Sequence, residues 1–124
     1  MIIMAPISVG ELIDKITILQ IKQTKITDEA KLVNVRRELA QLLAIFDDLI
    51  IPDVSDRANR LREINAELWD IEDFKRLCER DGAFGTQFIQ AARQVYIKND
   101  LRAQLKRDIN VQCGSTMVEE KSYK

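Results

Sequence analysis

The fold is decided by residues 60–80, which read Arg-Leu-Arg-Glu-Ile-Asn-Ala-Glu-Leu-Trp-Asp-Ile-Glu-Asp-Phe-Lys-Arg-Leu-Cys-Glu-Arg. Apolar residues recur in this stretch at helical spacing, namely Leu61, Ile64, Leu68 and Ile71. The only tryptophan, Trp69, lies beside them. The pattern predicts an amphipathic helix over about residues 56–80, which ends at a glycine-containing break at 81–85.

A first helix is predicted upstream from a capping pattern. Residues 8–11 read Ser-Val-Gly-Glu, which has capping-box spacing, so this helix should start near Val9. Its apolar stripe repeats at spacings of three and four residues through Leu12, Ile16 and Leu19. Ile18 and Ile21 fall off that stripe, which predicts a second contact surface, either with another helix or with another subunit.

The second and fourth helices complete the predicted architecture. Thr27-Asp28 can cap the second helix, and Pro52 ends it. Its apolar residues keep unbroken heptad spacing: Leu32, Val35, Leu39, Leu42, Phe46 and Leu49. The fourth helix should run from about Thr86 to the Gly114-Ser115 pair.

Short turns within each pair of helices favour antiparallel packing. The fold class is therefore all-α, as a four-helix antiparallel arrangement of two helical hairpins. We expect a single helical domain over residues 1–124, in which 1–7 form an extended arm, 8–113 the helical bundle and 114–124 an extended tail.

Composition excludes several classes of function. The chain has 19 basic and 20 acidic residues, so its net charge of −1 provides no field that would attract nucleic acid or an anionic membrane. The apolar run at 1–7 lacks a basic flank and is too short for a signal or spanning segment, so we expect a cytoplasmic protein. The absence of histidine excludes His-based zinc sites and Ser-His or Cys-His nucleophiles. Cys78 and Cys113 should lie roughly 30–40 Å apart in the second hairpin, too far for a disulfide.

Two rows of like charge fall on the third and fourth helices. The acidic row is Glu63, Glu67 and Asp70, and the basic row is Lys98, Arg102 and Lys106. A hairpin closed near residues 82–84 sets Glu67 opposite Lys98 and Glu63 opposite Arg102. The same register places Trp69 level with Tyr96, at a separation suited to an edge-to-face ring contact.

The charged rows have two interpretations. One is a set of interhelical ion pairs, which we favour, with Asn65, Asn99 and Asp100 joining Lys98 and Arg102 in a polar network. The other is a Mg²⁺ site in a hydrolase or transferase acting on a nucleotide or nucleotide-sugar, with Lys98 or Arg102 on phosphate. Its ligands would be Glu63, Glu67, Asp70 and Asp73. We assign no catalytic residue and no cofactor.

Five segments carry a family resemblance. They read SVGELIDKITIL at 8–19, KLVNVRRE at 31–38, LWDIED at 68–73, VYIKNDLRA at 95–103 and GSTMVEEKSY at 114–123. Through them the chain resembles a small all-helical family of bacterial and phage proteins of unknown function. Some members of that family occur near glycosyltransferase or surface-polysaccharide genes. The resemblance supplies no catalytic residues, and neighbourhood alone does not make an enzyme.

The resemblance extends through the C-terminal tail, which has two possible roles. It is either a disordered chain end or a peptide docked on its own or a neighbouring subunit. The candidate interaction residues of the tail are Glu119, Glu120, Lys121 and Tyr123. The favoured function is an accessory module for protein–protein interaction with an unidentified protein partner. We expect a homodimer formed through the surplus apolar residues of the first helix and the Ile2-Ile3-Met4 run.

Overall fold

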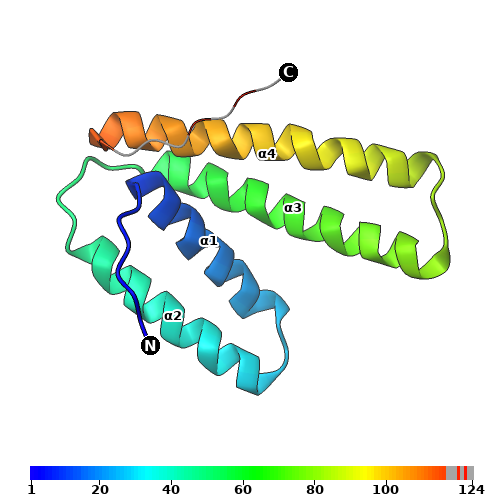
Figure 1. The fold of residues 1–124 in the computed structure, drawn as a ribbon, viewed down its shortest axis with the longest axis horizontal. Coiled ribbons are helices and arrows are strands. Elements are labelled where there is room, and N and C mark those ends of the chain that lie inside the picture. The colour runs from blue at the N-terminus through cyan, green and yellow to red at the C-terminus, as the bar shows by residue number, and fades with distance from the viewer. Residues whose placement is uncertain (117–119, 121, 123–124) are drawn as a thin grey trace.

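The computed structural model describes residues 1–116, 120 and 122, which form four helices and no strand (Figure 1). The helices are α1 (Val9–Lys25), α2 (Glu29–Asp47), α3 (Ser55–Asp81) and α4 (Thr86–Cys113). In each hairpin the second helix returns antiparallel to the first. The predicted all-α fold of two helical hairpins is therefore confirmed.

Helix α1 is the central element, because it packs against each of the other three helices. One face of α1 presents Leu12, Ile16 and Leu19 to Val35 and Leu39 of α2, as the heptad pattern predicts. Within the four helices, α1 is the only helix that α2 contacts. The first hairpin is thus held to the second one chiefly through α1.

The opposite face of α1 packs into the second hairpin. Ile13 joins a second core cluster with Leu61 of α3 and Ile109 of α4. Ile21 is buried, and together with Ile18 it lines a pocket that α3 also forms. The apolar residues that fall off the first stripe of α1 therefore face other helices of the same chain.

The helix ends follow the predicted signals in most respects. Ser8 Oγ accepts a hydrogen bond from the Glu11 backbone N–H at 3.1 Å. The Asp28 carboxylate caps α2 by accepting from the backbone N–H of Ala30 and Lys31. In a complete capping box the Glu11 side chain would also reach back to the backbone N–H of Ser8. The Glu11 carboxylate instead pairs with Lys106 and Lys15.

At the start of α3, the Asp53 carboxylate accepts hydrogen bonds from the backbone and hydroxyl of Ser55. These bonds favour the charged form and lower the pKa of Asp53. At the far end of α3, Gly82 has a φ of 66°, a left-handed conformation that glycine adopts without steric cost. Each boundary of α3 thus has a local cause in the sequence.

The closed end of the α3–α4 hairpin extends beyond α1 and α2 (Figure 1). Tyr96 of α4 is 56% exposed, and the predicted contact between Trp69 and Tyr96 is wrong for the described residues. Trp69 instead lines a pocket with Ile18 and Ile21, because α1 packs on this side of the hairpin. Leu101 of α4 is also exposed.

Gly10 allows the first turn of α1 to lie directly against α4. A Cβ atom built at this position would be 2.5 Å from the Lys106 carbonyl oxygen and 2.9 Å from Asn110 Oδ1. Both distances are shorter than normal contacts, and one of the atoms belongs to a helix backbone, which cannot rotate away. The absence of a side chain at Gly10 therefore sets the separation of α1 and α4.

We predict that Gly10→Ala destabilises the protein by about 2 kcal/mol in urea unfolding, because the added methyl group forces α1 and α4 apart. Helix propensity alone would change stability in the opposite direction, by up to about 1 kcal/mol. Gly85→Ala is the matched control, since a Cβ there meets no atom within 4 Å. It should cost no more than about 1 kcal/mol, the effect of alanine at a helix N-cap. A stabilised Gly10→Ala protein would contradict the packing described here.

Candidate functional site

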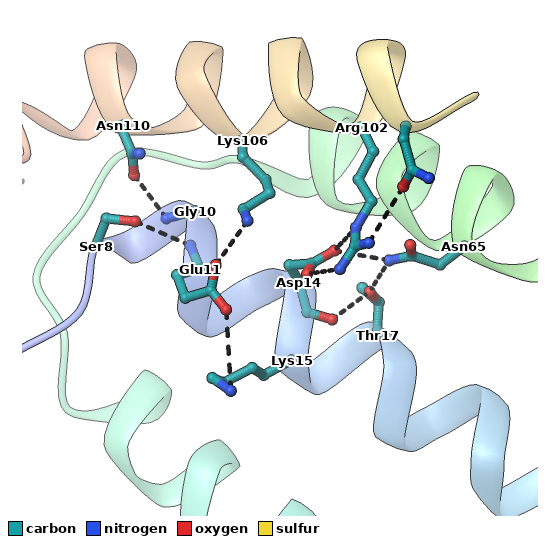
Figure 2. Close-up of polar contacts among 11 residues, drawn as sticks. Ser8, Gly10, Glu11, Asp14, Lys15, Thr17, Asn65, Arg102, Lys106 and Asn110 are labelled. Atoms are coloured by element: carbon teal, nitrogen blue, oxygen red, sulfur yellow. Dashed lines mark hydrogen bonds and ion pairs between the residues drawn. The ribbon is translucent and has the colours of Figure 1, made fainter. Parts of the chain in front are cut away.

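A buried carboxylate lies where α1, α3 and α4 meet (Figure 2). The Asp14 side chain is 1% exposed and accepts two hydrogen bonds from Arg102, at 2.9 Å from Nε and 2.5 Å from Nη2. Asn65 Nδ2 donates a third bond to Asp14 Oδ1 at 2.9 Å. The contact between the Asp14 carboxylate and the Arg102 guanidinium group is bidentate and charge-assisted, which makes it stronger than hydrogen bonds between neutral groups. One carboxylate of α1 thus joins side chains from both helices of the second hairpin.

Thr17 and Asn99 extend this network. Thr17 Oγ1 accepts a hydrogen bond from Asn65 Nδ2 at 2.9 Å and donates to the Asp14 carbonyl oxygen at 2.8 Å. Asn99 Oδ1 lies 3.4 Å from Arg102 Nη1, which is a long hydrogen bond. The polar side-chain atoms of Asp14 and Thr17 therefore have hydrogen-bond partners, as buried polar groups in folded proteins generally do.

A second set of polar contacts fixes the first turn of α1 on α4. The Gly10 backbone N–H donates to Asn110 Oδ1 at 2.7 Å, and Glu11 pairs with Lys106 at 2.6 Å (Figure 2). The first N–H groups of a helix have no partner within the helix, so Asn110 satisfies one of them from outside. Asn110 is fully buried, and its Nδ2 has no hydrogen-bond partner in the described residues.

The charged rows on α3 and α4 pair only in part as predicted. Lys98 contacts Glu67 at 2.6 Å, which confirms the predicted hairpin register. The predicted pairing of Glu63 with Arg102 is wrong: Glu63 pairs with Arg60 at 3.1 Å, and Arg102 binds Asp14 of α1. The reason is that α1 packs against this face of the hairpin and offers Arg102 a buried carboxylate. Of the predicted network residues, Asn65 and Asn99 meet Arg102 or its partner.

The acidic residues proposed as magnesium ligands face different neighbours. Asp70 pairs with Lys25 of α1 at 3.2 Å, Glu67 with Lys98 and Glu63 with Arg60. Across the described part of the chain, no three Cys, Asp or Glu residues are grouped closely enough to hold a metal ion. The magnesium site stays a prediction, and the observed pairs agree better with the ion-pair interpretation.

The remaining predicted residues lie outside this network or outside the described residues. Asp100 is half-buried on α4 and shows no side-chain partner among the described contacts. In the tail, the Glu120 carboxylate pairs with Arg107 at 2.9 Å. Glu119, Lys121 and Tyr123 lie outside the described residues.

Sequence reasoning missed Asp14, Thr17, Gly10 and Asn110. A signal was present, because Gly10, Asp14 and Thr17 fall at i, i+4 and i+7 and so lie on one line of the helix, which the apolar Ile21 continues. An acid inside such a pattern predicts a buried partner of opposite charge. Nothing in the sequence near Asn110 shows that its side chain accepts a hydrogen bond from the Gly10 backbone, since 100 positions separate Asn110 from Gly10.

Two of the pockets in the described part of the chain open on different sides of α1. The first, the arm groove, has a volume of about 540 Å³ and lies between the N-terminal arm (residues 1–7) and α2. The second, the corner pocket, has a volume of about 420 Å³ and is formed by α1, α3 and α4. The two share no lining residue. Both cysteines are free, and burial raises the pKa of the Cys113 thiol, which lowers its reactivity at neutral pH.

We predict that Asp14→Asn destabilises the protein by about 3 kcal/mol in urea unfolding. The new amide would direct N–H groups at donors of Arg102 and Asn65 and would leave the guanidinium group without its carboxylate. Asp70→Asn is the matched control, because it removes an exposed ion pair and should change stability by no more than about 0.5 kcal/mol. Equal losses for the two variants would show that the Asp14 network is no more important than a surface pair.

No helix of the described chain is long and apolar enough to cross a membrane. Among curated proteins and among solved structures, no match to this chain is found. One family model matches residues 3–124, which is nearly the whole chain. The protein therefore belongs to a family of unknown function, DUF6165.

Proposed function

We propose that the protein is an accessory module that works through protein–protein interaction, and that it forms a homodimer through the arm groove. The observation that supports this proposal is the concentration of exposed apolar side chains on this side of the molecule. In the arm, Ile2, Ile3 and Met4 are 75%, 78% and 86% exposed. Apolar residues that cluster on a surface, unlike isolated ones, mark an interaction site.

The wall of the groove opposite the arm is also apolar. It includes Leu42 and Ile45 of α2 and Leu49 just after the helix, and of these Ile45 and Leu49 are exposed. Helix α2 packs against α1 alone among the helices, so no other helix of the described chain lies against its outer surface. The arm and α2 therefore present two apolar surfaces that no part of the described chain covers.

A second copy of this chain is the occupant that fits both surfaces. An isologous dimer needs a patch that is complementary to itself, and here a protruding apolar arm lies beside an apolar groove. Each copy could place its arm in the groove of the other. The net charge of −1 adds little repulsion between copies. Ile18 and Ile21 do not take part in this surface, because they line the corner pocket with α3.

We predict that the wild-type protein sediments as a dimer at micromolar concentration, at twice the chain mass of 14.3 kDa. Ile45→Glu should weaken the dimer by roughly 100-fold or more, because it places a charge in the centre of the groove, where desolvation is costly. The measurement is analytical ultracentrifugation over a range of protein concentrations, with circular dichroism to confirm that the helices persist.

Ile89→Glu is the matched control for the Ile45 variant. Ile89 is an exposed isoleucine of α4 and does not line the arm groove, so this variant should stay dimeric. A wild-type protein that remains monomeric at all concentrations would overturn the homodimer. If both variants dissociate, or neither does, the interface lies elsewhere and the arm groove is not the dimer surface.

A further inference from the structure

The corner pocket lies next to the Asp14 network and has a composition suited to a small molecule. Its volume of about 420 Å³ lies within the range of small-molecule sites in proteins. Ile18 and Ile21 of α1 and Leu68 and Trp69 of α3 supply apolar walls. A flat apolar group fits such walls, because an indole ring packs favourably against another aromatic ring.

Asn65 supplies one polar group from the floor of this pocket. The residue is 6% exposed, and its Nδ2 donates to both Asp14 and Thr17. Its Oδ1 is turned away from Thr17 (Figure 2) and accepts no hydrogen bond within the described contacts. A fixed amide whose donors are already used presents an acceptor only, so a ligand must bring an N–H or O–H group to it.

Two opposite charges lie at the mouth of the pocket. Asp73 and Arg76 are one helical turn apart on α3, and both line the pocket. Opposite charges at this spacing commonly pair, yet in the described contacts neither side chain has an ion pair or a hydrogen bond. Glu72, by contrast, pairs with Lys75 at 3.6 Å. The mouth thus offers one carboxylate and one guanidinium group, both available to a ligand.

We propose that the corner pocket binds a free aromatic α-amino acid whose ring carries a hydrogen-bond donor. Its α-carboxylate pairs with Arg76, its α-ammonium group pairs with Asp73, and its ring packs against Trp69. The donor on the ring bonds to Asn65 Oδ1. L-Tyrosine has all four features, and binding it leaves the bond between Asp14 and Arg102 intact. This site is separate from the arm groove and does not depend on dimer formation.

Trp69 makes the proposal directly measurable, because it is the only tryptophan in the chain and lines the pocket. The full chain is titrated with L-tyrosine while indole fluorescence is excited selectively. Three analogues each lack one feature: tyramine lacks the carboxylate, 3-(4-hydroxyphenyl)propionate lacks the ammonium group and L-phenylalanine lacks the hydroxyl. We expect a saturable change with L-tyrosine and an affinity roughly tenfold lower for each charge-deleted analogue.

Variants of the two charges connect each analogue to a residue. Arg76→Gln should weaken L-tyrosine binding roughly tenfold and leave tyramine binding unchanged, since tyramine has no carboxylate to lose. Asp73→Asn should behave in the same way toward 3-(4-hydroxyphenyl)propionate. Glu79→Gln, an exposed charge on α3 that does not line the pocket, is the control and should bind L-tyrosine as the wild type does.

Two results would overturn the proposal. The first is the absence of a saturable response to both L-tyrosine and L-phenylalanine, which would mean that the pocket does not bind such molecules. The second is equal affinity for L-tyrosine and the charge-deleted analogues, which would mean that Asp73 and Arg76 do not recognise a zwitterion.

Discussion

The burial of the Asp14 carboxylate is the constraint on which the rest of the structure depends. An ionised group removed from water is costly unless it is paired and hydrogen-bonded, so the chain must supply donors at this point. Arg102 and Asn65 supply them from two different helices. Any sliding or rotation of α1 against the second hairpin would break these bonds. The bonds of Asp14 thus select one arrangement of the three helices. Buried polar groups of this kind specify an arrangement rather than add much net stability.

The contact at Gly10 adds a second constraint, which acts on the distance between α1 and α4. The Asp14 network fixes where α1 lies along the second hairpin, and the missing side chain at Gly10 fixes how closely α1 approaches α4. Between them, Ile13 packs against Leu61 and Ile109 with almost no exposed surface. Polar, steric and apolar contacts thus occur within one or two helical turns of each other. Together they allow one arrangement of α1 on the second hairpin.

The sequence was sufficient where structure follows from local or pairwise patterns. Heptad spacing in residues 32–49 predicted the face of α2 that packs on α1, although Leu49 at its end is exposed. Equal-rise geometry predicted the pairing of Glu67 with Lys98. The same geometry failed for Arg102, because a calculation on two helices cannot include a third helix that offers a better partner. For the same reason the expected contact of Trp69 with Tyr96 is not formed, and Trp69 lies beside α1 instead. The candidate site was therefore mostly missed, since its members come from three helices far apart in the chain.

The attachment of α2 to α1 alone has a consequence for how the molecule unfolds. Helix α2 can detach without breaking the hydrogen bonds of Asp14, Arg102 and Asn65, all of which lie on the other three helices. Proteins open in partly independent cooperative units, and the unit with the fewest tertiary contacts opens at the lowest free energy. The backbone amides of α2 should therefore exchange their hydrogens with solvent through a local opening, while those of α1, α3 and α4 exchange only when the three-helix unit separates.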